Sequence, residues 1–502
     1  MFFSYFSIAF CFFLLYHIKL DCYFQFMITA SERNDFSPMS KLQHDFTQGP
    51  IGRELVSFCI PFLLSNVLQA LYGAVDMWVV GNFSAADAAT RTAILSGVNI
   101  GSQITNLVAM MVSGLTVAGT VMVGQYIGAK KPRDASETVG TMFSMLALLG
   151  VVLTVAMIAL SGPILHLLST PEESFGYAKE YLNICLLGTL FIFGYNAISS
   201  IQRGMGDSVR PLIFVGVACV VNIGLDLWMV KGLGMGAAGA AWATIIAQAV
   251  SLMLAAWYLS RSKFIFDFRL SSFRIVKNKL ATMVRLGIPS SVQSIIVNVS
   301  FLVMTAMVNS IGGYVASAAV GVVGKFNSFA ILPAVAMSSS VSAFVAQNIG
   351  AGFYDRAKKS LGVGLIIALA INVCVFALVQ LFPAEIISIF DQNPETVSNG
   401  VAYMRTFSFD YLLVPVLFCI NGLIMGAGHT FFTLLTASIS SLLLRIPVAV
   451  LLGKTAGWGL PGVGLAGPAA SVAALTLAVW FFFSGRWLQN KTGISRDEVP
   501  AE

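Results

Sequence analysis

The sequence has few charged residues: Asp, Glu, Lys and Arg make up only 10% of its 502 residues, whereas apolar residues make up 57%. Soluble globular proteins contain about 25% charged residues. A water-soluble protein of this length cannot bury so many apolar side chains, because much of its surface must contact water. The composition therefore excludes a soluble domain, a disordered chain and a disulfide-rich scaffold, and it predicts an integral membrane protein.

Motifs for metal binding and covalent catalysis are also missing. The seven cysteines form no CxxC pair, there are only four histidines, and neither HExxH nor GxSxG occurs. Zinc sites, redox sites and hydrolytic nucleophiles need such groupings. The net charge of +6 is too small to suggest nucleic-acid binding. We therefore expect no enzyme, no nucleic-acid partner and no cofactor other than a transported ion.

The sequence does contain long apolar runs, which exclude a β-barrel built from short alternating segments. A membrane-spanning helix needs about 20 mostly apolar residues. Segments that meet this requirement lie at 55–80, 93–122, 139–162, 180–201, 211–230, 236–259, 283–308, 316–345, 361–382, 402–425, 430–452 and 463–486. We expect an all-α integral membrane protein with twelve transmembrane helices in two six-helix lobes, and an extra apolar segment at the amino terminus.

Lys and Arg gather on one side of these spans. Lys130 and Lys131, Arg203 and the basic segment 260–282 all fall on the side of the two termini, whereas the opposite loops hold few basic residues. Basic residues are retained in the cytoplasm. The pattern predicts that both termini are cytoplasmic. We also expect the protein to lie in the plasma membrane, the inner membrane of a bacterium.

The chain before the first span is apolar and aromatic but lacks the charged start and the cleavage site of a signal peptide. We expect residues 1–38 to be a dispensable extension, with Met27 and Met39 as alternative starts; an extra membrane span is the alternative. The expected organisation is an extension at 1–46, an amino-terminal lobe at 47–259, a cytoplasmic linker at 260–282, a carboxy-terminal lobe at 283–488 and a cytoplasmic tail at 489–502.

The two halves of the chain repeat each other. Residues 124–129 match 346–351, and residues 203–207 match 425–429 with the same offset. Residues 59–61 match 287–289 with a slightly larger offset. Six spans per half is an even number, so the halves have the same topology. This parallel repeat is typical of transporters that bind their substrate between the halves.

Several segments resemble the multidrug and toxic compound extrusion (MATE) family over residues 47–488. They read LYGAVDMWVVG at 71–81, VGQYIGAKKPRDA at 123–135, RGMGDSVRP at 203–211, VVNIGLDLWMV at 220–230 and GMGAAGAAWAT at 234–244. The resemblance implies twelve helices in two lobes around a V-shaped cavity. It also implies export of organic cations and drugs, coupled to inward movement of sodium ions or protons.

Five polar side chains fall within spans of the first half: Asp76, Asn196, Asn222, Asp226 and Thr244. Ionisable groups inside a membrane are costly and mark functional sites, and hard cations prefer oxygen ligands. The equivalent positions in the second half are all apolar. The five residues match the positions at which the family builds a cation-coupling site, so we predict that they bind Na⁺ or a proton. A buried hydrogen-bonded cluster without a role in transport is the alternative.

Other polar residues are less clearly assigned. The seventh span has no acid, although some members of the family carry a glutamate there. Asp410, Lys325 and Arg445 are candidates for substrate binding or coupling, with structural pairing as the alternative. Pro61 is a candidate hinge in the first span, and we expect Gln125 and Gln347 to terminate helices.

The predicted function is export of amphipathic, cationic drugs or toxic compounds in exchange for inward Na⁺ or H⁺ by alternating access. The expected partners are a small organic molecule and the lipid bilayer, and the expected state is a monomer. A flippase for lipid-linked oligosaccharides is the alternative, but it would need more basic residues in its cavity. The sequence leaves open the substrate and the choice between sodium and proton.

Overall fold

The computed structural model describes residues 44–262 and 264–489, and these form α-, π- and 3₁₀-helices without a β-strand. The all-α fold is thus confirmed. Most of the predicted extension at 1–46 and of the predicted tail at 489–502 lies outside the described residues.

Within the described residues, the first half contains seven α-helices and one π-helix. They are α3 (Ile51–Phe83), α4 (Ala88–Gly128), α5 (Pro132–Leu167), α6 (Glu172–Leu187), α7 (Thr189–Gly204), α8 (Val209–Asp226), η1 (Leu227–Gly232) and α9 (Gly236–Arg261).

The second half begins with a short 3₁₀-helix. Its elements are η2 (Leu270–Ser272), α10 (Lys277–Ala330), α11 (Leu332–Gly350), α12 (Tyr354–Leu381), α13 (Pro383–Ser388), α14 (Pro394–Phe407), α15 (Asp410–Gly426), α16 (Thr430–Ser438), η3 (Ile439–Arg445), α17 (Ile446–Ala449), η4 (Val450–Thr455), α18 (Gly459–Phe483) and η5 (Arg486–Leu488). Helix α10 is interrupted at Gly313, whose φ of 62° favours glycine, and the two sides of this break belong to different spans.

Ten helical segments of the described chain are long and apolar enough to cross a membrane. Two further spans are bent pairs: α6 and α7 meet at 49°, and α14 and α15 meet at 45°. Counting each pair as one span gives the predicted twelve. The bends follow Leu187 and Phe407 and so fall at nearly equivalent places in the repeat, which the uninterrupted spans predicted at 180–201 and 402–425 did not include.

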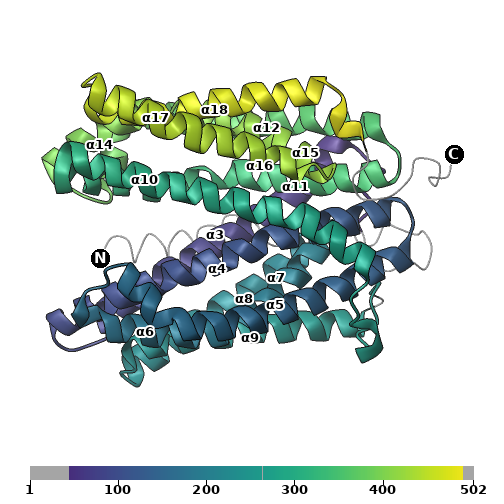
Figure 1. Cartoon of the computed structure of the whole chain (residues 1–502), viewed down its shortest axis with the longest axis horizontal. Coiled ribbons are helices and arrows are strands. Elements are labelled where there is room, and N and C mark those ends of the chain that lie inside the picture. Colours follow the sequence, from purple (N-terminus) through teal and green to yellow (C-terminus); the bar gives the residue numbers. More distant parts are fainter. Residues whose placement is uncertain (1–43, 263, 490–502) are drawn as a thin grey trace, which may run out of the picture. The chain divides into compact units, whose positions relative to one another are not determined.

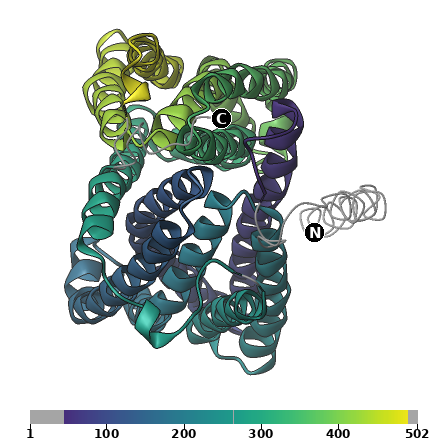
Figure 2. The same ribbon diagram turned by 90° about the vertical axis from the view of Figure 1, so that its right-hand side faces the viewer.

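Helices α3–α9 form one bundle and helices α10–α18 form a second, within the part of the chain that the structure describes (Figure 1). The first span of each half contacts the other half: α3 packs against α11 and α12, and α10 packs against α4 and α5. Figure 2 shows the start of α3 beside the carboxy-terminal helices. The lobes are therefore joined by a reciprocal crossing as well as by the direct packing of α4 on α11.

Burial separates inner helices from outer ones. In the most apolar stretch of α4, 67% of the residues are buried, whereas the shares for α5 and α12 are only 17% and 22%. Apolar side chains on these outer helices are largely exposed, among them Val155 at 66% and Ile366 at 71%. Exposed apolar surface of this extent is expected for a protein that faces lipid.

Candidate functional site

Asp76 and Asp226 lie together inside the amino-terminal lobe. Asp76 is on α3 and Asp226 is the last residue of α8, and these two helices pack directly on each other. Both side chains are buried, with residue exposures of 7% and 0%. Their carboxyl groups are close enough to interact electrostatically. The structure therefore places these acids of spans one and five near each other inside the lobe.

The backbone changes at Asp226. The α-helix ends there and continues as the π-helix η1, so the hydrogen-bond ladder is locally widened. Single π-turns within helices are rare and occur often at functional sites. The carboxyl group of Asp226 therefore projects from a point where the helix is already irregular.

Several polar atoms of this cluster have no hydrogen-bond partner within the described residues. They are Oδ1 of Asp76, both carboxyl oxygens of Asp226, and both polar side-chain atoms of Asn222. An unsatisfied buried polar group costs about 1–3 kcal/mol. Such a cost is offset when a cation or proton binds, and the donor set of carboxyl and amide oxygens fits a hard cation. Among the described residues, no group of three or more His, Cys, Asp and Glu side chains forms a site for another metal ion.

The other two predicted ligands, Asn196 and Thr244, lie on two other helices of the same lobe. Asn196 is half-buried on α7, and its side-chain amide donates to the carbonyl oxygen of Ile192 at 2.8 Å. Thr244 is half-buried on α9, which packs on both α7 and α8. Within the described residues, no hydrogen bond joins either side chain to Asp76 or Asp226. A role for Asn196 and Thr244 in ion binding stays a prediction.

The structure adds neighbours that the sequence prediction missed. Three residues lie close enough to Asp76 to interact with it electrostatically. They are Tyr72, one turn earlier on α3, and Tyr181 and Cys185 of α6. Gln248 of α9 is within hydrogen-bonding reach of the Tyr72 hydroxyl. Spacing offered a signal for two of them, because Tyr72 precedes Asp76 by four residues and Gln248 follows Thr244 by four.

A second buried polar cluster lies in the carboxy-terminal lobe. Arg445, the last residue of the π-helix η3, donates from Nη1 to the Ser300 hydroxyl at 3.1 Å, and its guanidinium lies 4.6 Å from the ring centre of Phe301. Asp410, at the start of α15, interacts with Arg445 and with Ser471. Nε of Arg445 and Oδ1 of Asp410 have no hydrogen-bond partner within the described residues. The structure thus brings together two of the three other candidates.

The two clusters occupy related places in the repeat. By the offsets of the repeat, Tyr403 beside Arg445 is the equivalent of Tyr181, and Ser300 is the equivalent of Tyr72. The charged residues differ, because Arg445 aligns with Ile223 and Asp410 aligns with Gly188. Comparing positions one by one correctly finds apolar equivalents of the five predicted ligands, but it does not reveal that the second lobe has a buried ionic cluster of its own.

The remaining predicted residues are placed as follows. Lys325 is exposed on the second part of α10, and no ion pair joins it to another described residue. Pro61 is buried inside the continuous helix α3, and its carbonyl accepts a hydrogen bond from the Ser65 hydroxyl at 2.9 Å. Neither position tests the predicted roles.

Gln125 and Gln347 join the two lobes. The Gln125 side chain donates from Nε2 to the carbonyl oxygen of Gly426 at 2.9 Å, and Gln347 donates in the same way to Gly204 at 3.0 Å. Both glutamines lie in the last turn of their helices, as expected, and their side chains in addition reach across the interface between the lobes.

The chain just before α3 makes further contacts at the same end of the molecule. Phe46 is buried, its amide N–H donates to Oε1 of Gln347 at 3.0 Å, and Arg356 donates from Nε to its carbonyl oxygen at 3.0 Å. His44 contacts Glu54, and its amide N–H donates to the carbonyl oxygen of Met205. This short segment therefore contacts helices of both halves.

Ion pairs also join the halves at this end. Lys279 of α10 pairs with Asp134 of α5, with Nζ and Oδ1 at 2.6 Å. Arg274, which precedes α10, pairs with Glu137 of α5, with Nη2 and Oε1 at 3.4 Å. The end of the molecule that carries most basic residues is thus closed by contacts between the halves.

Comparisons with known proteins agree with this architecture. The MatE family matches residues 61–228 and 289–451. The probable multidrug resistance protein YpnP of Bacillus subtilis is 30% identical over 89% of this chain and 98% of its own length. A FAD transporter of Shewanella oneidensis is 24% identical over 82% of this chain and 90% of its own length. The outward-facing structure of a multidrug resistance MATE transporter superposes with a TM-score of 0.82 at 21% identity, covering 89% of this chain and 98% of that one.

Proposed function

Since this chain belongs to the MATE family of multidrug efflux transporters, we propose that it is an antiporter that exports amphipathic organic cations in exchange for inward Na⁺ or H⁺. Members of the family are transporters, so the chain is a multi-pass membrane transporter and not an enzyme. The proposal concerns the coupling ion, the chemical class of the substrate, a monomeric state, and a plasma-membrane location with both termini in the cytoplasm.

The observation that carries the proposal is the buried pair of Asp76 and Asp226, with unpartnered oxygens beside Asn222. Two adjacent carboxylates in a low-dielectric interior repel each other, and each is costly to ionise. A sodium ion or a proton between them removes both penalties. An ion that arrives from outside would therefore be held here until the lobes change their arrangement.

Alternating access fits the contacts between the lobes. Those made by Gln125 and Gln347 lie at the end that carries Lys130, Lys131 and Arg356, which the distribution of basic residues assigns to the cytoplasm. With this end closed, the ion and the drug exchange with the outside. Separation of these contacts would open the route from the cytoplasm, and Pro61 is the proposed hinge in α3.

The membrane potential is sufficient to drive about tenfold efflux of a neutral compound. Inward movement of one positive charge at 100 mV releases about 2.3 kcal/mol. A tenfold uphill gradient of a neutral compound costs about 1.4 kcal/mol. For a monovalent cation exchanged one for one, no net charge moves, so the concentration gradient of the coupling ion must supply the energy.

The test is efflux from proteoliposomes that contain the full chain, with ethidium as the probe and either a sodium gradient at fixed pH or a pH gradient without sodium. Asp76→Asn and Asp226→Asn should each abolish gradient-driven efflux. Asp267→Asn removes the same charge from an exposed loop residue and should have no effect. Normal coupling in Asp76→Asn would refute the site assignment.

A second candidate substrate class is anionic. One relative is a FAD transporter, and Arg445 is a buried cation in the carboxy-terminal lobe. The same liposomes loaded with FAD distinguish the two classes. Gradient-driven efflux of FAD without efflux of ethidium would replace the cationic substrate in the proposal and leave the coupling site in place.

A further inference from the structure

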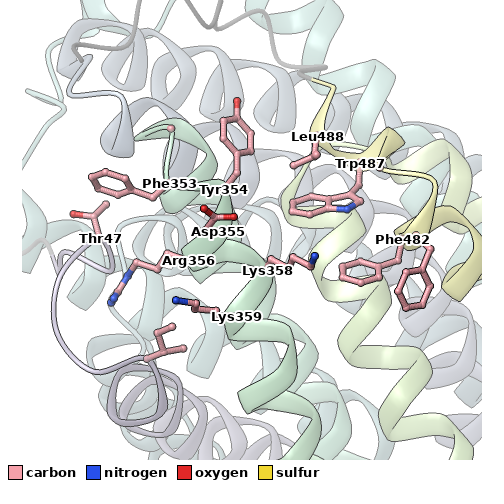
Figure 3. Close-up of a pocket in the computed structure, with 14 residues that line it drawn as sticks. Thr47, Phe353, Tyr354, Asp355, Arg356, Lys358, Lys359, Phe482, Trp487 and Leu488 are labelled. Atoms are coloured by element: carbon pink, nitrogen blue, oxygen red, sulfur yellow. The ribbon is translucent and has the colours of Figure 1, made fainter. Parts of the chain in front are cut away.

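A pocket of about 890 Å³ lies beside the start of α12, apart from both buried polar clusters (Figure 3). Its wall includes the turn and first residues of α12, the last residues of α18 with η5, and the chain that enters α3. These are helix ends, so the pocket lies where the transmembrane part of the described chain meets its basic surface. We call it the basic–aromatic pocket.

Three cations and one acid line this pocket: Arg356, Lys358, Lys359 and Asp355. Arg356 is held by the backbone carbonyls of residues 46, 48 and 49. Lys358 and Lys359 are exposed, and neither forms an ion pair with another described residue. In Figure 3, Lys358 extends toward Phe482 and Trp487, whereas Lys359 extends toward Arg356. The pocket therefore presents two ammonium groups and an excess of positive charge.

Aromatic rings form the other wall. Trp487 is buried and stacks on Phe482, with ring centres 5.9 Å apart, whereas the neighbouring Phe483 is 79% exposed. Aromatic residues gather at the level of the lipid headgroups, where one part of the ring contacts apolar chains and the other meets water. This wall therefore has the composition of a membrane interface rather than that of a water-facing groove.

We propose that the basic–aromatic pocket binds the phosphate of an anionic phospholipid from the cytoplasmic leaflet. Basic pockets between transmembrane helices on the cytoplasmic side bind such headgroups. Lys358 and Lys359 would contact the phosphate, and the exposed ring of Phe483 would contact the glycerol and the upper acyl chain. The proposal rests on the cytoplasmic orientation of this end and is independent of the coupling ion and the drug.

The experiment uses the purified full chain in two kinds of nanodisc, one of pure phosphatidylcholine and one in which a minor fraction is replaced by phosphatidylglycerol. Native mass spectrometry counts the lipids retained after transfer to detergent. The variant is K358Q/K359Q. The matched control, R261Q/K277Q, removes two exposed positive charges from the same end of the molecule outside the pocket.

The expected result is selective retention of phosphatidylglycerol, about 10- to 30-fold weaker in K358Q/K359Q and unchanged in the control. Inorganic phosphate at millimolar concentration should not displace the lipid, and displacement would identify free phosphate as the ligand instead. Equal retention of the two lipids, or equal loss in the control, would overturn the proposal. Binding that occurs only after deletion of residues 490–502 would also overturn it, because the pocket would then hold the chain's own tail.

Discussion

Gln125 and Gln347 occupy equivalent positions in the two halves, and each donates a hydrogen bond to the carbonyl of a glycine in the opposite half. The glycines, Gly426 and Gly204, are also equivalent, so the same contact is made twice around the repeat axis. Substitution of one glutamine therefore removes one of the two equivalent contacts and leaves the other in place. The contribution of each contact to closing this end of the molecule can therefore be measured separately.

The first prediction concerns these glutamines. Gln347→Ala should open this end, because Gln347 donates to the Gly204 carbonyl and also accepts the amide N–H of Phe46. Each hydrogen bond is worth about 1 kcal/mol, which shifts the equilibrium between closed and open forms roughly fivefold. Spin labels introduced through Arg133→Cys and Asp355→Cys, at exposed positions of the two lobes, report the opening by electron–electron distance measurement.

The matched control is Gln380→Ala, which removes an amide that bonds within the carboxy-terminal lobe to the Arg405 carbonyl oxygen and to Ser408. It should leave the distance distribution unchanged. An unaltered distribution in Gln347→Ala as well would mean that these contacts do not hold the lobes together.

The second prediction concerns the glycines beside the glutamines. A Cβ atom on Gly350 would collide with the carbonyl oxygen of Gln125, and one on Gly128 would collide with that of Gln347. Gly350→Ala should therefore disfavour the closed form and increase the open fraction in the same distance measurement. Gly362→Ala places a methyl group of α12 in open space and serves as the control for helix propensity. A closed fraction equal to that of wild type in Gly350→Ala would contradict the close packing of α4 on α11.

Hydropathy was sufficient to predict the twelve spans, and matching sequence segments were sufficient to predict the repeat. The bends after Leu187 and Phe407 could not be predicted, because the mean hydropathy of a segment is the same whether its helix is straight or bent. The neighbours Asp76 and Asp226 could be proposed from their rarity in apolar spans. The proximity of Arg445 to Asp410 could not be predicted from the sequence. Their equivalents in the first half, Ile223 and Gly188, are uncharged, and only the packing of the helices brings the two residues together.

The third prediction concerns the acidic pair. Asp226→Asn replaces one of two repelling carboxyl groups by a neutral group of the same shape, so the protein should become more stable by roughly 1–2 °C while coupling is lost. Saturating coupling ion stabilises the wild type by binding its folded form, and this stabilisation should disappear in the variant. Thermal unfolding followed by Trp fluorescence, with and without sodium at two pH values, measures both effects. A lower melting temperature in Asp226→Asn would show that the pair does not repel.

The fourth prediction concerns pH and the chain before α3. The hydrogen bond to Glu54 raises the pKa of His44 above its ordinary value of 6.5. The protonated form therefore favours the folded state, and this contribution is complete below about pH 6.5 and is lost as the pH rises through the raised pKa. The His44 side chain is 46% exposed, so solvent screening makes the effect small. Melting temperatures between pH 6 and 9 should fall less steeply for His44→Gln than for wild type, and parallel curves would exclude His44 as the titrating group.

The fifth prediction concerns the cluster of the carboxy-terminal lobe. Arg445→Met leaves the buried Asp410 without the nearby cation that interacts with it, so the free energy of unfolding should fall. Adding Asp410→Asn to Arg445→Met removes the remaining charge, so the double variant should recover most of the lost stability in a double-mutant cycle. We expect the double variant to fold but not to regain gradient-driven efflux, because Ser300 and Arg445 lie on the spans that are equivalent to those of Asp76 and Asp226 in the first lobe. Full efflux in the stable double variant would instead assign Asp410 and Arg445 a purely structural role.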